Sequence, residues 1–270
     1  MLAENPSSEG ASFPDERQER IAEMVATRGK VRIGQLTELF GVSEPTVRKD
    51  LTLMEQRGLL KRTHGGAVSI RPPVEQAITS RLAEHAEAKR LIGKACVELL
   101  APGEAIFLDS GTTVQQIAHA LAGTGLRLTV LTDSPSSAEA LADLPGVSHL
   151  LIGGQLRRIS GCLTGPLAME NLKQFTISTA FLGASGLSEI GVSVSDLSEA
   201  QLKAAVVAMA QRVVLPIDHT KIGISDFAHV CDIADLDIIV TNEVSDRLEK
   251  LCRGSQVQLV AAQANGARRR

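Results

Sequence analysis

The chain is 270 residues long, a length that suits two domains of unequal size. Its 44% hydrophobic and 22% charged residues allow a buried core and exclude disorder of the whole chain. With 2% aromatic residues it lacks the side chains for a stacking surface for single-stranded nucleic acid, and its net charge of −3 argues against a uniformly basic surface.

The four cysteines lie far apart, without a CxxC pair or a histidine at zinc-finger spacing, so neither a metal site nor a disulfide framework is predicted. No run reaches the ~18 apolar residues of a membrane span. Residues 1–14 have the polar composition of a disordered lead-in, not of an export signal. We therefore expect a soluble cytoplasmic protein without cofactor, metal or membrane contact.

Residues 15–71 are predicted to form a winged helix-turn-helix. Apolar residues recur at helical spacing from Ile21 to the stop at Gly29, and again in a short second helix that ends at Gly41. A third helix begins where Ser43 can cap the free backbone N–H groups. Two extended runs, 59–63 and 67–70, then form a β-hairpin around His64-Gly65-Gly66.

The third helix has the pattern of a DNA-recognition helix. Val47, Leu51 and Met54 form one apolar face, and polar and basic side chains point the other way, as suits the major groove. Residues 45–71 carry six basic residues against two acidic ones, a local charge of +4. Charge and spacing alone leave open a helical hairpin whose basic face is merely solvated.

The run Arg71-Pro72-Pro73 interrupts regular structure, so residues 72–84 are predicted to be a linker. Residues 85–262 are predicted to form an α/β domain with a largely parallel sheet, because apolar runs alternate with helices and suit strands that are covered on both faces. Residues 263–270 are expected to be a flexible tail. The predicted strands are 105–108, 128–131, 149–152, 180–182, 213–217 and 237–240.

Polar loops follow five of these strands. In an open α/β sheet such loops meet at the carboxyl edge, where ligands bind. The segment DSGTT at 109–113 leads into a helix near Val114, so its N–H and hydroxyl groups could hold a phosphate; a capped helix without ligand is the alternative. The other loops are TDS at 132–134, IGG at 152–154, GASG at 183–186 and IDHTK at 217–221.

Three charged residues and one histidine could belong either to the ligand site or to the solvent-exposed surface. Lys221 could contact a phosphate or be a solvated surface lysine, and His219 fits a surface position better than the ligand. Glu199 and Lys203 are four residues apart on a predicted helix, which by itself favours an exposed ion pair worth about 0.3–0.5 kcal/mol. No pairing of a histidine with a nucleophile is readable from the sequence, and no GxSxG motif is present.

Three linked segments, RQERI at 17–21, SEPTVRKDL at 43–51 and RTHGGAV at 62–68, resemble the N-terminal signature of the DeoR family of bacterial regulators. The resemblance implies that this region binds DNA and that Asp50 positions a basic group. Lys49 stands where the family often has Arg, which could alter base preference because Lys lacks the forked donor. The predicted DNA-binding residues are Ser43, Pro45, Thr46, Arg48, Lys49, Thr52, Arg62, His64, Gly65 and Gly66.

Residues 75–243 resemble the effector domain of the same family, which is similar in fold to ribose-5-phosphate isomerase and CoA-transferase-like enzymes. This implies a phosphosugar pocket. Asp133 stands where the family commonly has Asn, and Pro216 where a small residue is usual; an extra carboxylate would favour different hydroxyl or amine partners. The predicted ligand-binding residues are Asp109, Ser110, Gly111, Thr112, Thr113, Thr132, Asp133, Gly153, Gly154, Glu199, Lys203, Asp218 and Lys221.

The sequence thus predicts a transcriptional regulator, by default a repressor of a carbohydrate-metabolism operon. Its expected partners are double-stranded operator DNA, a phosphorylated sugar and further copies of itself in a dimer or tetramer. One alternative is a sugar-phosphate isomerase or CoA-transferase-like enzyme, with Glu199, Lys203 and Asp109 as acid–base groups. Another is a protein-interaction module whose basic helix binds an acidic partner; only the regulator predicts salt-dependent DNA binding.

Overall fold

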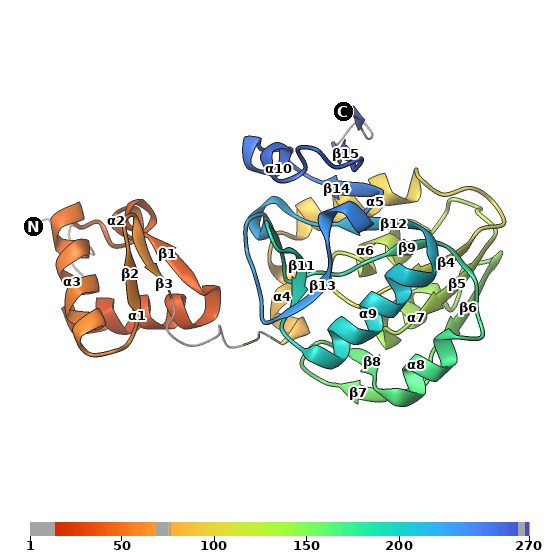
Figure 1. Cartoon of the computed structure of the whole chain (residues 1–270), viewed down its shortest axis with the longest axis horizontal. Helices are drawn as coiled ribbons and strands as arrows, with labels where there is room; N and C mark the ends of the chain where they lie inside the picture. The colour runs from red at the N-terminus through yellow and green to blue at the C-terminus, as the bar shows by residue number, and fades with distance from the viewer. Residues whose placement is uncertain (1–13, 69–74, 76, 264–267, 270) are drawn as a thin grey trace, which may run out of the picture. The chain divides into compact units, whose positions relative to one another are not determined.

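The computed structural model describes residues 14–68, 75, 77–263 and 268–269. Outside these residues lie 1–13 of the predicted lead-in, 69–71 of the predicted winged helix, 72–74 and 76 of the predicted linker, and 264–267 and 270 of the predicted tail. The chain divides after residue 76 into two compact units, shown in Figure 1. Among the described residues, no helix combines the length and the apolar character needed to cross a membrane.

The first unit is a winged helix, as predicted. Three helices pack around one core that includes Ile21, Leu36, Leu51 and Met54, and a three-stranded antiparallel sheet in the order β1-β3-β2 forms the wing (Figure 1). The hairpin was predicted, whereas β1 was not, because three residues between two helices carry too little pattern. The elements are α1 (Pro14–Arg28), β1 (Lys30–Arg32), α2 (Ile33–Phe40), α3 (Glu44–Gln56), β2 (Lys61–Thr63) and β3 (Gly66–Val68).

Two glycines in this unit lie at positions that favour glycine, one for its backbone conformation and one for lack of space. Gly41 ends α2 in the left-handed conformation at φ 62°, which glycine adopts without strain. Gly66 is buried in β3, where an added Cβ would lie 1.9 Å from the carbonyl oxygen of Val31 in β1. Gly66 therefore allows the wing strands to pair closely.

The second unit is an α/β domain around a parallel sheet. Seven strands in the order β15-β14-β12-β9-β4-β5-β6 run parallel, and β16 pairs antiparallel with β15. Its elements are α4 (Ile78–Ala83), α5 (Ala86–Val97), β4 (Ala105–Leu108), α6 (Gln115–Ala120), β5 (Leu128–Thr132), α7 (Pro135–Leu141), β6 (Val147–Leu151), β7 (Gln155–Arg157), β8 (Cys162–Thr164), α8 (Pro166–Leu172), β9 (Ile177–Phe181), β10 (Gly186–Ser188), β11 (Gly191–Val194), α9 (Leu197–Met209), β12 (Ala210–Pro216), η1 (His219–Lys221), β13 (Ala228–Cys231), η2 (Ile233–Asp235), β14 (Ile238–Thr241), α10 (Asp246–Leu251), β15 (Gln258–Ala261) and β16 (Arg268–Arg269).

Helices cover both faces of the sheet, as the apolar strands predicted. Ile92 of α5, Ile117 of α6 and Leu141 of α7 belong to one buried cluster. Leu172 of α8 and Val206 of α9 belong to the other. The sheet is thus the middle layer of three, and the loops at its carboxyl edge are free to form a site.

Three features of this unit differ from the sequence-based expectation. Helix α4 lies within the range 72–84 that was predicted to be a linker. The short antiparallel sheets β7-β8 and β10-β11-β13 were not predicted, and neither was β15. The four cysteines do not differ from the expectation, since all are buried free thiols.

Candidate DNA interface and ligand pocket

Helix α3 buries one face and exposes the other. Val47, Leu51 and Met54 are buried, whereas Pro45 and Lys49 are exposed at the surface. The helix begins after Ser43, whose backbone carbonyl accepts from the N–H groups of residues 46 and 47. The expected cap by the Ser43 side chain is not formed, since its hydroxyl contacts the hydroxyl of Thr46 at 2.9 Å instead.

The other predicted DNA-contacting residues form a connected polar surface. The guanidinium of Arg48 donates to Glu44 at 2.6 Å, and Thr52 Oγ1 donates to the Arg48 carbonyl at 2.8 Å. Arg62 of β2 donates to the hydroxyl of Thr52 at 2.7 Å, so the wing is linked to α3. At the tip of the wing His64 and Gly65 are exposed, whereas Gly66 is buried.

Asp50 is not available to DNA. It lies on the buried side of α3, where its carboxylate accepts from the guanidinium of Arg17 at 2.7 Å and from the amide of Gln18 at 3.1 Å. Both members of the ion pair are buried. Asp50 therefore ties α3 to α1, and its structural role matches the expectation that it positions a basic group.

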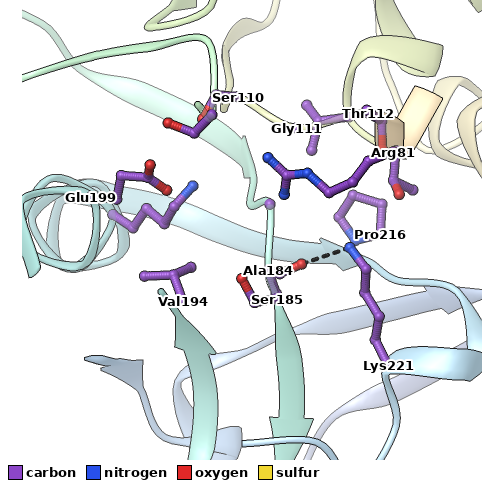
Figure 2. Close-up of a pocket in the computed structure, with 15 residues that line it drawn as sticks. Arg81, Ser110, Gly111, Thr112, Ala184, Ser185, Val194, Glu199, Pro216 and Lys221 are labelled. Atoms are coloured by element: carbon purple, nitrogen blue, oxygen red, sulfur yellow. Dashed lines mark hydrogen bonds between the residues drawn. The ribbon is translucent and has the colours of Figure 1, made fainter. Parts of the chain in front are cut away.

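The pocket of the second unit lies at the carboxyl edge of the sheet. It has a volume of about 440 Å³ and is formed by the loops after β4, β9 and β12, with contributions from α4 and α9 (Figure 2). The lining residues are Arg81, Ser110, Gly111, Thr112, Thr113, Val114, Ser160, Gly183, Ala184, Ser185, Val194, Glu199, Lys203, Pro216 and Lys221.

Lys203, which lines this pocket, forms a buried ion pair with Asp109, which lies behind the lining residues. The Lys203 amine donates to the Asp109 carboxylate, which also accepts from the backbone N–H groups of Ser110 at 2.9 Å and Gly183 at 2.6 Å. Burial by itself would lower the pKa of the amine, but the carboxylates of Asp109, Asp133 and Glu199 outweigh that effect and raise it. Lys203 is therefore charged at neutral pH.

Glu199 and Lys203 do not form the exposed ion pair that their spacing suggested. Both side chains are buried, and Glu199 pairs with Arg157 of β7 at 3.0 Å, while Lys203 pairs with Asp109. The expectation was wrong because the spacing places two residues on one side of a helix without telling whether that side is buried. In α9 this side faces the pocket and the sheet.

Lys221 is the second cation of the pocket. Its amine donates to the carbonyl of Ala184 at 2.8 Å (Figure 2). Burial lowers the pKa of Lys221 to about 8, and the nearby charges of Arg81 and Lys89 act in the same direction. The neighbouring Asp218 opposes this shift without cancelling it.

Besides Asp109 and Asp133, four further predicted ligand residues do not line the pocket and have structural contacts instead. The hydroxyl of Thr132 donates to the Leu108 carbonyl, and Asp218 accepts from the backbone N–H of Thr220 at 3.1 Å. The N–H of Gly153 donates to the side chain of Asn171 at 2.8 Å, and an added Cβ on Gly154 would lie 2.7 Å from the Thr164 carbonyl oxygen. These residues hold the loops in place around the pocket. His219 is exposed and contacts Asn242, as expected of a surface histidine.

Asp133 is fully buried beside the ion pair of Lys203 and Asp109. Its Oδ1 atom has no hydrogen-bond partner among the described residues. Burial, and then the nearby carboxylate of Asp109, raise the pKa of Asp133 well above its usual range. Burial at this position therefore disfavours the ionised form of the Asp133 carboxyl group, relative to an exposed aspartate.

Arg81, Ser160 and Ser185 line the pocket but were missed in the sequence. Arg81 belongs to α4, in a range where two prolines indicated only a linker. Ser160 lies between β7 and β8, and Ser185 directly before β10, and neither hairpin was predicted. Only Ser185 carried a signal, since it lies in the polar loop 183–186.

Comparison with known proteins identifies both units. A model of the DeoR-like helix-turn-helix domain matches residues 17–72, and a model of the DeoR C-terminal sensor domain matches residues 84–243. The chain belongs to the DeoR family. It is therefore a DNA-binding transcriptional regulator, and this decides against the enzyme and the protein-interaction module as the main function.

Relatives in this DeoR family match along most of the chain. The HTH-type transcriptional repressor GlcR of Bacillus subtilis (strain 168) is 30% identical over 259 residues, covering 94% of this chain and 99% of the relative. The Glycerol-3-phosphate regulon repressor of Escherichia coli (strain K12) is 30% identical over 228 residues, covering 84% of this chain and 90% of the relative.

Among solved structures, ribose 5-phosphate isomerase A from Methanocaldococcus jannaschii aligns with a TM-score of 0.41 at 11% identity, over 69% of this chain and 99% of that chain. A likeness this distant carries no argument about the function of the DeoR-family protein.

Replacing Lys203 by Met is expected to destabilise the sensor domain by about 3–5 kcal/mol, because it leaves buried carboxylates without their counter-charge. Urea unfolding of the full chain measures the loss, which should be smaller at pH 5 than at pH 8 since protonation neutralises the carboxylates. Lys173→Met is the matched control: Lys173 pairs with Glu170 on the surface of α8, and its loss should cost less than about 1 kcal/mol. Equal effects of the two substitutions would contradict the structural role of Lys203.

Proposed function

We propose that this protein represses a carbohydrate-metabolism operon and that a phosphorylated sugar controls its affinity for double-stranded operator DNA. The observation that carries the ligand assignment is the meeting of Arg81 and Lys221 with the hydroxyl-bearing loop 110–113 in one pocket. A guanidinium, an amine and hydroxyl donors suit the oxygens of a phosphate group. One relative is itself named for a glycerol-3-phosphate regulon.

In this proposal the two sides of the pocket have different tasks. Ser110 to Thr113 and Lys221 bind the phosphate, and Gly111, at φ 123°, lets the backbone come close to it. Glu199 and Lys203 face the sugar, where carboxyl and amine groups can exchange hydrogen bonds with hydroxyls, and Asp133 lies buried beside the Lys203–Asp109 pair. Asp109 acts by fixing Lys203, and Thr132, Gly153, Gly154 and Asp218 act by holding the loops.

On the DNA, α3 enters the major groove and the wing lies along the backbone. Pro45, Arg48 and Lys49 are exposed on α3, with Thr46 and Thr52 beside them. Lys49 and Arg48 approach base edges or phosphates, as does Ser43 at the start of the helix. Arg62, His64 and Gly65 contact the sugar-phosphate backbone.

We further propose that the protein acts in the cytoplasm as a dimer or tetramer. The strand β6 pairs on one side alone within the described part of the chain, and it exposes Leu150 and Leu151 at the edge of the sheet. Leu156 and Leu167, from the neighbouring β7 and α8, are exposed too. Apolar side chains beside a free strand edge are typical of contacts between subunits. Sedimentation velocity of the full chain should give a dimer or tetramer, and a monomer at micromolar concentration would refute this part.

The test of the function is fluorescence anisotropy with DNA from upstream of the protein's own operon, titrated at several salt concentrations and then with triose, pentose and hexose phosphates. We expect specific binding that weakens as salt rises and is weakened further by one of the sugar phosphates. Folded protein that binds none of the upstream DNA specifically, or binding that no sugar phosphate changes, would overturn the proposal.

Lys49→Ala should weaken operator binding by about 5- to 150-fold, the range for the loss of one base or phosphate contact of about 1–3 kcal/mol. Its thermal unfolding should match the wild type because the side chain is exposed. Lys173→Ala, an equal change of charge on the exposed surface of α8, is the control and should bind the operator as the wild type does. Binding of the Lys49 variant at wild-type strength would remove Lys49 from the interface.

Phosphate binding should weaken as the pH rises, because Lys221, with a pKa of about 8, loses its charge while the phosphate keeps its own. Between pH 7 and pH 9 the affinity should fall about tenfold, as the charged fraction of Lys221 falls. Isothermal calorimetry with the active sugar phosphate measures this. Lys221→Arg stays charged over this range and should lose the pH dependence; a fall of the same size in that variant would show that another group titrates.

A further inference from the structure

Helix α4 occupies a special place in the chain. It is the first element of the sensor domain, beginning at Ile78 directly after the segment that leads out of the DNA-binding domain. None of its six residues is buried. The N–H of Ile78 donates to the Ile159 carbonyl at 2.7 Å, and the Lys89 amine donates to the Arg81 carbonyl at 2.5 Å. A short helix without a buried residue belongs to the parts of a protein that open locally at low free energy.

The side chain of Arg81 reaches from this helix into the ligand pocket. Figure 2 shows its guanidinium extending toward the middle of the pocket, with Gly111 and Thr112 on one side and Ala184 on the other. Its Nε atom is buried and has no hydrogen-bond partner among the described residues. A buried donor without a partner is rare in proteins and marks a position where a ligand can complete the bonding.

The charges around Arg81 favour an anion as that ligand. Lys221 and Lys89 both lie near enough to Arg81 for their positive charges to disfavour one another. Lys203 is already paired with Asp109, and Glu199 with Arg157, so these side chains do not neutralise Arg81. An anion between Arg81 and Lys221 would replace repulsion by two charge-assisted hydrogen-bonding contacts.

We propose that Arg81, on α4, binds the phosphate of the effector. Effector binding in the pocket would thereby change the state of α4 and of the segment that joins the two domains. The loops after β4, β9 and β12 are fixed to the sheet, whereas α4 can be engaged or released. A ligand shifts an equilibrium only by binding one state better than the other, and the contact with Arg81 supplies that difference. The inference rests on the proposed function for the identity of the ligand and adds how its binding is communicated.

Hydrogen exchange of the full chain tests the grip on α4, with inorganic phosphate as the probe. In the wild type, phosphate should slow amide exchange in peptides that cover residues 77–84 by at least about threefold, because opening of α4 then requires release of the anion. Arg81→Gln, which keeps the length and polarity but not the charge, should show no slowing. Absence of slowing in the wild type, or equal slowing in Arg81→Gln, overturns the proposal.

Operator binding tests the communication, with the sugar phosphate that acts most strongly in the anisotropy screen. At saturating effector the operator affinity of the wild type should fall by about 5- to 150-fold, the usual range of coupling between sites, and that of Arg81→Gln by less than about twofold. Lys221→Ala should need more effector but reach the wild-type fall, since Lys221 binds the anion without belonging to α4. If Arg81→Gln reaches the wild-type fall at saturation, Arg81 does not transmit the signal.

Arg90→Gln is the matched control, because Arg90 lies on the next helix, α5, where it pairs with Glu87 on the surface. It should behave as the wild type in both experiments. Arg81→Lys separates charge from shape: partial coupling supports a phosphate grip, and none at all with an unchanged thermal midpoint indicates that the guanidinium fork is required. A wild type that fails to bind operator refutes the regulatory function, whereas a responsive wild type with an equally responsive Arg81→Gln refutes this inference alone.

Discussion

The sensor domain depends on one lysine amine and one carboxylate that lie together inside the protein. Taking such a pair out of water costs several kcal/mol per ion, and the attraction offsets this only where further hydrogen bonds complete the geometry. The carboxylate of Asp109 has these bonds, from the backbone N–H groups of Ser110 and Gly183. The pair thereby ties together the loop after β4, the loop after β9 and helix α9, and these three segments contribute residues to the lining of the pocket.

Because Asp109 and Lys203 pair with each other, Asp109 does not pair with the other two cations that line the pocket, Lys221 and Arg81. Lys221 donates to a backbone carbonyl and Arg81 has a buried donor without a partner in the described residues. The DNA-binding domain divides its charges in the same way. Asp50 forms a buried ion pair with Arg17 inside the domain, while Lys49, directly before it in the sequence, is exposed at the surface. In both domains a buried carboxylate pairs with one cation inside the structure, and neighbouring cations stay outside that pair.

The sequence predicted those parts of the molecule that depend on local pattern. Apolar runs located the sheet, and the polar loops after them located residues 110–113 and Lys221, because strand ends converge in any parallel sheet. It could not predict which side of α9 is buried, so Glu199 and Lys203 were wrongly paired. It also assigned Gly153 and Gly154 to the ligand, although the Gly153 N–H is bonded to Asn171 and Gly154 lies against Thr164. These contacts join different elements of the fold, so the spacing of residues in the sequence does not predict them.

The sequence did not predict that Arg81 of α4 lines the pocket. A parallel sheet brings its own loops together by topology, but nothing in topology brings a segment from before the first strand to the same place. That difference has a physical use. A well-packed sheet transmits little motion, because its side chains interlock and any shift costs energy throughout the core. A signal that must leave the domain needs an element that has two states of similar free energy and that contacts the ligand. In our proposal α4 is this element, because it has no buried residue and Arg81 provides the contact.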